Sequence, residues 1–179
     1  MKKQKNTAAR LFLGLTIVLG SITAGEVKAQ GGMVATDQDA TLTVRLNEAI
    51  GLEVLKTATT LEFLTAADYQ NGVSKTEASA LRVTSTRAYE LKVKSRSASL
   101  THSAGSTIDI GNVNIETPTV LSSNNMVALS TADQTIATGA AVIKKEIDLK
   151  YSTNTANAAF IGKPEGDYTA AIVYSVVTL

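Results

Sequence analysis

Apolar and polar residues alternate with a period of two along much of the chain, which is typical of β-strands that bury one face. The cleanest example is residues 89–94, where Tyr89, Leu91 and Val93 alternate with charged residues. No segment after residue 29 keeps a helical period over several turns. The alternation predicts further strands over residues 41–47, 50–56, 60–63, 80–85 and 141–151, with weaker candidates at 126–129 and 135–136.

Polar stretches separate these candidates. Residues 65–76 contain turn-forming residues and predict a loop, and residues 95–107 are mostly polar. Over residues 141–151 the expected inward row contains Ile143, Ile147 and Leu149, with one interruption at Lys145. Short strands spaced roughly 8 to 12 residues apart, with turns between them, predict an all-β fold of the immunoglobulin-like sandwich type. The sequence shows no internal repeat, and residues 49–179 are predicted to form the single sandwich domain.

The C-terminal segment, residues 166–179, is the strongest strand prediction, because it is rich in β-branched and aromatic residues. Both of its faces are apolar, which predicts a place inside a sandwich and not at an exposed edge. Such a strand needs backbone partners on both sides. One row of its side chains, opened by Gly166, comprises Tyr168, Ala170, Ile172, Tyr174 and Val176.

Residues 41–47 are the best candidate for one of those partners. Leu42, Val44 and Leu46 lie on one face of this predicted strand, and Thr43 and Arg45 lie on the other. The sequence leaves open whether the strand completes its own molecule or a neighbouring one.

The N-terminus has the three parts of a secretory signal peptide. Four basic residues, Lys2, Lys3, Lys5 and Arg10, precede an apolar run over residues 11–22, and small residues end at Ala29. Residues 1–29 are therefore predicted to be removed, leaving an N-terminal arm over residues 30–48. The apolar run is shorter than the roughly 20 residues that cross a bilayer, so no stable membrane insertion is predicted.

Composition narrows the possible partners. After cleavage the chain keeps 12 basic and 15 acidic residues and a net charge of −3, which gives no reason to expect a nucleic acid partner. It contains no Cys, although an exported protein could form disulfides. Stability is therefore expected to come from burial and strand pairing, and thiol chemistry is excluded.

Candidates for chemistry are few. His102 is the one histidine and lies in a polar stretch, so we expect an exposed loop residue without a catalytic role. Asp37 with Asp39, and Asp68 with Asn71, could contribute oxygen ligands to calcium, but they are too sparse for a calcium loop. The sequence therefore predicts no enzyme, no cofactor and no metal site.

A basic cluster surrounds one predicted hairpin, and it could be a solvated sheet face or a binding surface. Its members are Arg82, Arg87, Lys92, Lys94 and Arg96.

Several of these segments together resemble a known family. The segments are residues 41–47, 60–63, 81–85, 89–93 and the terminal strand opened by Gly166. In order and spacing they resemble subunits of archaic chaperone–usher pili, the spore coat protein U-like group. The similarity covers residues 41–94 and 162–179.

The resemblance implies an immunoglobulin-like sandwich that lacks one strand and is completed by the N-terminal extension of the next subunit. Leu42, Val44 and Leu46 would be the donor residues, and the terminal strand would line the groove. The implied protein is a fimbrial subunit with a role in adhesion or biofilm. It would cross the periplasm with a chaperone, assemble at an outer-membrane usher, and stay at the cell surface.

Two features depart from the family pattern. Leu52 and Ser85 stand where members commonly carry a cysteine pair, and the chain ends in Val-Val-Thr-Leu without a terminal aromatic residue. The alternative hypothesis is a self-complete secreted β-sandwich module that binds a surface glycan or protein, with the basic cluster as its binding surface.

Overall fold

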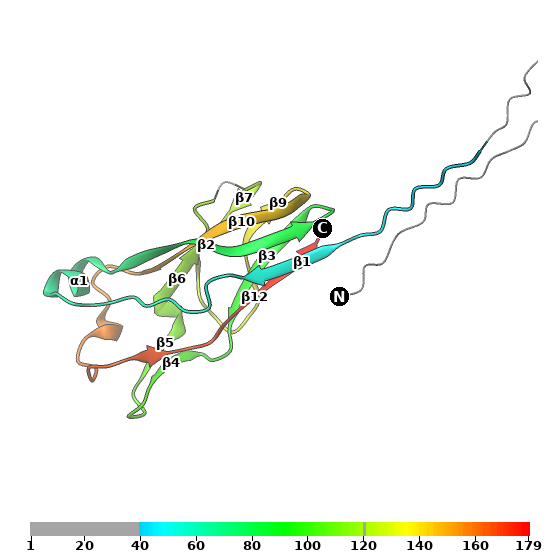
Figure 1. Ribbon diagram of the computed structural model, residues 1–179. Helices are drawn as coiled ribbons and strands as arrows, with labels where there is room; N and C mark the ends of the chain where they lie inside the picture. The colour runs from blue at the N-terminus through cyan, green and yellow to red at the C-terminus, as the bar shows by residue number, and fades with distance from the viewer. Residues whose placement is uncertain (1–39, 120) are drawn as a thin grey trace, which may run out of the picture. The chain divides into compact units, whose positions relative to one another are not determined.

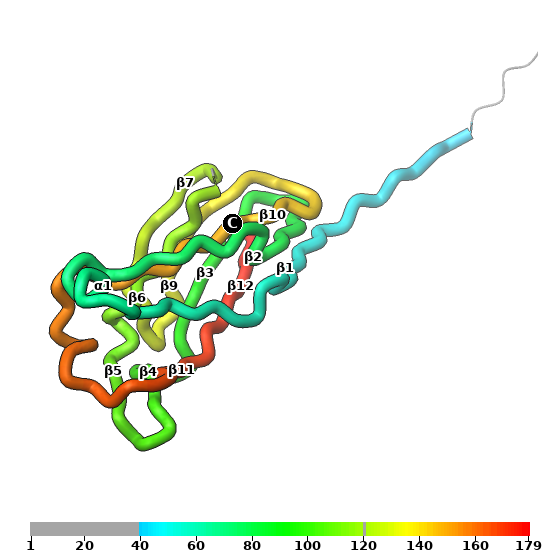
Figure 2. The backbone as a smooth tube through the Cα atoms, turned by 60° about the vertical axis from the view of Figure 1, so that its left-hand side comes forward, coloured from blue at the N-terminus to red at the C-terminus, as the bar shows by residue number. Residues whose placement is uncertain are grey.

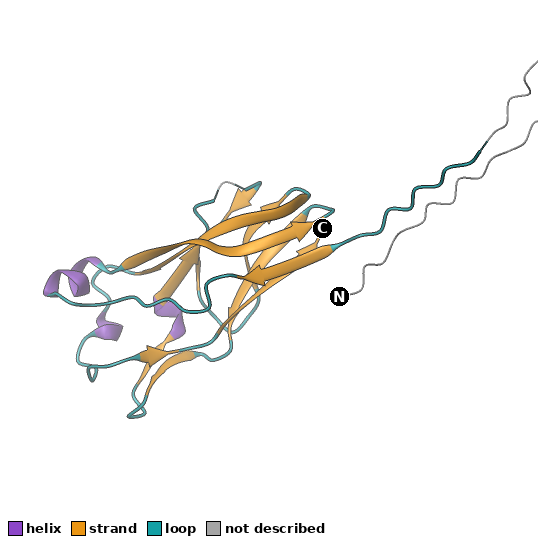
Figure 3. Cartoon of the chain, in the orientation of Figure 1, coloured by secondary structure: helices purple, strands orange, loops and turns teal. Residues whose placement is uncertain are grey.

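The computed structural model describes residues 40–119 and 121–179. The chain divides into two units, Met1–Thr43 and Val44–Leu179, and the second holds all the regular structure of the described residues. The predicted signal peptide, its cleavage site and residues 30–39 lie outside the described part. Strands dominate the second unit (Figure 3), so the predicted all-β, sandwich-like fold is confirmed.

Three antiparallel sheets make up this unit (Figure 1). The five-stranded sheet contains, in spatial order, β1 (Ile50–Val54), β2 (Ser74–Ser85), β10 (Val142–Thr153), β6 (Val113–Glu116) and β8 (Val127–Ala128). The four-stranded sheet contains β12 (Ile172–Thr178), β3 (Tyr89–Ser95), β9 (Gln134–Gly139) and β7 (Ser123–Asn124). A smaller sheet contains β11 (Tyr168–Thr169), β4 (Ser99–His102) and β5 (Thr107–Asp109).

The core lies between the two larger sheets, because both contribute fully buried side chains to one cluster. On β3 the predicted alternation is confirmed, since Tyr89, Leu91 and Val93 are buried and the charged residues between them are not. The five-stranded sheet contributes Leu81, Val83, Ile115, Ile147 and Leu149, and β9 contributes Ile136 and Ala137.

The predicted loop over residues 65–76 contains a short helix, α1 (Ala66–Asn71), and the start of β2. The side chain of Thr65 accepts a hydrogen bond from the backbone N–H of Asp68, whose carboxylate bonds back to the N–H of Thr65. Backbone and side-chain bonds from Thr65, with the bond from Leu64, lower the pKa of Asp68. A helix of six residues is too short to show a helical period, so the sequence pattern missed it.

The predicted strand over residues 60–63 is wrong, because this segment has no strand partner. Leu61 packs against the core and Phe63 stacks on Phe160 with ring centroids 4.8 Å apart, so side-chain packing alone produced the alternating pattern. Two 3₁₀ helices, η1 (Ile110–Asn112) and η2 (Ala158–Phe160), also interrupt apolar stretches.

The expected inward row of β10 is wrong at its first member. Ile143 is 65% exposed, whereas Ile147 is fully buried. A bulge between Val142 and Lys145, with Lys144 at φ +53°, moves the first residues of the strand to the other face. The bulge explains why Lys145 interrupts the alternation of apolar and polar residues in the sequence.

The C-terminal segment is not one strand. It breaks at residues 170–171, so that β11 joins the small sheet through pairing with β4 and β12 joins the four-stranded sheet through pairing with β3. The prediction that this strand lies inside a sandwich is wrong for the described residues, because β12 is the edge strand of its sheet.

Candidate functional site: two open sheet edges

β1 and β12 are both edge strands, and they lie side by side without pairing to each other. Each has a partner on one side only, β2 for β1 and β3 for β12, within the part of the chain that the structure describes. Both views of the molecule show the two strands next to each other (Figures 1 and 2). Each strand therefore leaves one row of backbone N–H and C=O groups without a strand partner.

The inward-facing side chains of β12 are only half-buried. The register places Ile172, Tyr174 and Val176 opposite Ser95, Val93 and Leu91. Those partners on β3 are 0–2% exposed, whereas no residue of β12 is fully buried. The hydrophobic core is therefore open along this strand.

The same is true of β1. Its inward row is Ile50, Leu52 and Val54, which lie opposite the buried row of β2. Ile50 is 42% exposed and Val54 is 41% exposed, while Leu52 is half-buried. We refer to β1 and β12 with these two apolar rows as the open edge.

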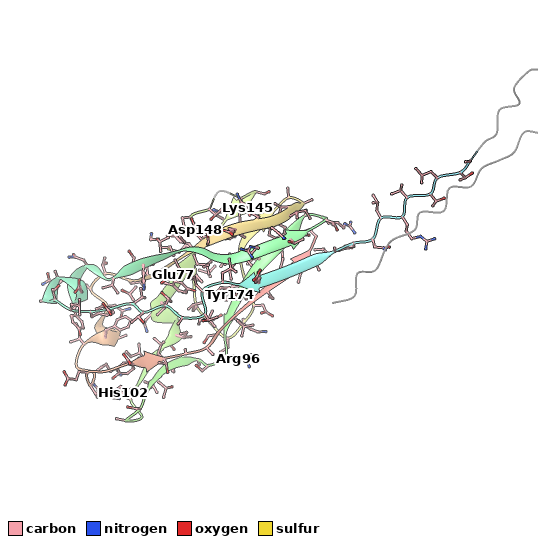
Figure 4. All side chains as sticks on the ribbon, in the orientation of Figure 1. Glu77, Arg96, His102, Lys145, Asp148 and Tyr174 are labelled. Carbon is pink, nitrogen blue, oxygen red and sulfur yellow. The ribbon has the colours of Figure 1, made fainter. Side chains whose placement is uncertain are left out.

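A tyrosine pair lies at the open edge. The hydroxyl groups of Tyr174 on β12 and Tyr151 on β10 are hydrogen-bonded, which links the two large sheets. Figure 4 labels Tyr174, the member of the pair on β12. Burial raises the pKa of Tyr174 far above its ordinary value, and it also raises the pKa of Tyr151. Both hydroxyl groups therefore stay protonated at physiological pH, and the pair is structural.

The predicted donor segment is unpaired. Residues 40–49 form no strand, and all of them are exposed. Leu42 is 88% exposed, Val44 72% and Leu46 89%. These side chains therefore keep nearly all of the apolar surface that a partner could bury.

The base of this arm is held by the turn between β2 and β3. Ala49 accepts a hydrogen bond from the backbone N–H of Thr86, and the N–H of Ala49 donates to Thr86 Oγ1, both at 2.9 Å. These bonds extend the β1–β2 ladder by one residue. The C-terminus reaches the same turn, because the N–H of Leu179 donates to the carbonyl of Ala88 at 2.8 Å. We call this end of the unit the arm end.

The remaining residues predicted for the terminal groove strand lie elsewhere. Tyr168 belongs to β11 and stacks on His102 with centroids 5.0 Å apart, while Ala170 packs against the core. Gly166 has φ +127°, and a Cβ at this position would lie 2.5 Å from His102 Nε2. Of the predicted row, the structure therefore brings only Ile172, Tyr174 and Val176 to the open edge.

The expectation that His102 is an exposed loop residue is wrong. It ends strand β4, is half-buried, and accepts a hydrogen bond at Nδ1 from the backbone N–H of Ala104. Figure 4 shows it on the small sheet, well apart from Tyr174. His102 packs against the ring of Tyr168 and the backbone of Gly166, so its contacts are those of a packing residue.

The basic cluster does not form one surface. Arg82 projects from the five-stranded sheet and bonds Glu53 and Glu146 at 2.9 and 3.0 Å, and these bonds raise its pKa. Bonds from Ser79 and then from Arg82 lower the pKa of Glu146. The other ion pairs of the cluster are Arg87 with Glu48, Lys92 with Glu90, and Lys94 with Asp133. Four of its five cations are therefore already matched by carboxylates.

Ligand chemistry has little support in the described residues. They contain no group of three His, Cys, Asp or Glu side chains that could hold a metal ion. Within residues 40–119 and 121–179, no helix has the length and apolar character needed to span a membrane.

Sequence reasoning missed the role of β1. The alternation of Ile50, Leu52 and Val54 predicted a strand, but an ordinary one. Nothing in the sequence signals that this strand faces β12, since about 120 residues separate them. No known protein family has a model that matches the chain, and no curated protein matches it. The resemblance to pilus subunits therefore stays a prediction.

Proposed function

We propose that the protein is a secreted structural subunit of a cell-surface fibre, and that copies polymerise when residues 41–47 of one copy complete the open edge of another. The observation that carries this proposal is the pair of edge strands, each paired on one side only and with a partly exposed inward row, together with the exposed aliphatic side chains of residues 41–47 on the same chain. The open edge offers backbone groups and apolar surface without a partner, and residues 41–47 offer a segment that could pair with them.

The energetics favour such pairing. Burying a Leu or Val side chain contributes roughly 1.5–3 kcal/mol before entropy costs, and three of them project from one face of residues 41–47. A strand inserted beside β1 and β12 also provides partners for two rows of backbone groups. The outward residues Thr43 and Arg45 are suited to the solvated side of such a strand.

Pairing between copies is favoured over pairing within one copy. To return onto its own β1, the arm would have to reverse at residues 48–49 in a two-residue hairpin. Such hairpins favour Asn or Gly because their turns need positive φ, and here the two residues are Glu48 and Ala49. The Ala49–Thr86 bonds hold this point in line with β1 instead.

The direction of the inserted strand decides the type of assembly. β1 runs away from the arm end and β12 runs towards it, as their registers with β2 and β3 require. A donor strand parallel to β1 and antiparallel to β12 brings the donor's body to the opposite end of the acceptor, so the contact repeats as an open chain. The reverse direction brings two arm ends together and favours a closed dimer.

The proposal includes assembly partners and a location. An open apolar edge promotes aggregation, so a subunit in transit needs cover. A periplasmic chaperone and an outer-membrane usher would supply cover and ordered assembly, and the fibre would serve adhesion or biofilm formation. The predicted signal peptide, and the net charge of −3 expected after its removal, are compatible with this route.

The test is a truncated domain without residues 30–48. We expect residues 49–179 to fold poorly alone and to become stable when a peptide of residues 40–48 is added, as followed by circular dichroism during heating. A peptide with Val44→Asp should have no effect, because it places a charge in the core. A truncated domain that is a stable monomer, indifferent to the peptide, would refute donor-strand exchange.

The self-complete binding module has less support, because the basic cluster that suggested it is largely ion-paired and the sheet edges are open. A purified full chain that stays monomeric at high concentration in size-exclusion chromatography would favour the module.

A further inference from the structure

We propose that neighbouring copies share a second interface, in which the far end of one copy packs against the arm end of the next. The far end consists of α1, η2 and residues 55–65 and 158–163. The arm end consists of Ala49, the 86–88 turn, residues 139–143 and Leu179. This inference rests on the proposed donor-strand exchange and names a further surface of the same partner, a second copy of this chain.

The far end lies at the mouth of the open edge. The chain that leaves β1 runs through residues 55–65, and the chain that enters β12 runs through residues 158–171. Phe63 of the first segment stacks on Phe160 of the second, at 4.8 Å between ring centroids, and also contacts Tyr69 of α1 at 5.0 Å. The aromatic stack therefore joins the two sides of the open edge where an inserted strand would leave it.

A backbone hydrogen bond joins two segments of the far end. The N–H of Ala156 donates to the carbonyl of Gln70 at 2.8 Å, which ties α1 to the segment before η2. An open hollow of about 490 Å³ lies beside α1, and Leu64 is among its lining residues together with Leu61 and Asp68. A protruding side chain of another molecule could enter this hollow.

Half of the exposed large hydrophobic side chains in the described residues lie at or beside the two ends. Of the twelve in the described residues, three belong to the arm and two, Ile50 and Val54, belong to the open edge. Met126 lies near β7 and β8, on the side of the sandwich opposite the open edge. The other six are Leu64, Tyr69 and Ile161 at the far end, and Ile143, Val177 and Leu179 at or beside the arm end.

The arm is too short to keep the two ends apart. Only residues 48 and 49 separate the predicted donor strand from β1, so three Cα–Cα steps span at most about 11 Å. Ala49 is hydrogen-bonded to Thr86, so the β2–β3 turn lies close to the start of β1. A donor strand that ends at the acceptor's far end therefore brings the donor's arm end into contact there, and apolar surface meets apolar surface.

The test uses cysteine pairs, since the chain contains no native cysteine. Full chains carrying Ile161→Cys and Ile143→Cys are assembled, treated with a short bis-maleimide cross-linker, heated in detergent and separated by electrophoresis. We expect covalent ladders from this pair. The matched control, Ile161→Cys with Met126→Cys, should return to monomer, because Met126 is also highly exposed but lies away from both ends. A second pair, Leu64→Cys with Leu179→Cys, replaces the first if that variant does not assemble.

The unheated samples separate the two proposals. Multimers that resist detergent before heating but yield no cross-linked species would overturn the end-to-end interface and leave donor-strand exchange intact. Equal cross-linking of the Met126 control would also overturn it, because the contact would then be unspecific. If neither cysteine variants nor the unmodified chain form multimers, the proposed function fails and this interface fails with it.

Discussion

The alternation of residues 41–47 makes a quantitative prediction. If Val44 enters the core of a neighbouring molecule, Val44→Ala removes two methyl groups from a buried site. Val44 is 72% exposed in the free arm, so most of its transfer free energy is available on binding. At about 0.8 kcal/mol for each carbon group, the loss is about 1.6 kcal/mol, which corresponds to a roughly 15-fold weaker dissociation constant.

Arg45→Ala is the matched control, because it changes the neighbouring residue on the opposite face. An exposed substitution of this kind is expected to change binding by no more than about 0.5 kcal/mol, or roughly twofold. The comparison isolates the buried face, since both peptides keep the same backbone and length.

The assay is the melting temperature of residues 49–179 across a range of peptide concentrations. A ligand that binds only the folded state stabilises it by RT ln(1 + [L]/Kd), so a weaker peptide shifts the whole curve to higher concentration. The Val44→Ala curve should shift about 15-fold and the Arg45→Ala curve about twofold. Equal shifts would refute the assignment of faces, and a larger shift for Arg45→Ala would mean that the strand inserts with the opposite register.

Two further predictions concern the sandwich itself. Burial raises the pKa of Tyr174 and Tyr151, so their contribution to stability is present below pH about 10 and is lost as the pH rises above it. In that range Tyr174→Phe should reduce the slope of the unfolding free energy against pH by up to about 1.4 kcal/mol per pH unit, as measured by denaturant titration at several pH values. An unchanged slope would contradict the burial of this hydroxyl group. Gly139→Ala should lower the free energy of unfolding by about 1–3 kcal/mol and lower the melting temperature, because its Cβ would overlap the ring of Tyr89. The control is Gly51→Ala, whose Cβ would meet nothing within 4 Å; similar losses for both variants would contradict the close approach at Gly139.

Local patterns in the sequence were sufficient for the elements with one face in the core. The alternation of Tyr89, Leu91 and Val93 predicted β3 with its correct faces. Successive side chains of a strand point to opposite faces, so a strand with one buried face shows apolar residues at every second position. The same rule predicted strands at β1, β2 and β10, and with them the all-β fold. The rule failed where a bulge shifts the inward-facing positions by one residue, as at Lys144. It also failed where side chains pack without backbone pairing, as at Phe63.

The sequence by itself determined that the chain is β-rich, that apolar side chains alternate along residues 41–47, and that residues 166–179 are apolar on both faces when extended. Only the tertiary structure decided that β12 is an edge strand, that β1 lies beside it, and that the inward rows of both are half-exposed. The reason is that alternation reports which side of a strand is buried, whereas edge position depends on which strands pair. That pairing joins residues far apart in the chain, and no local pattern records it.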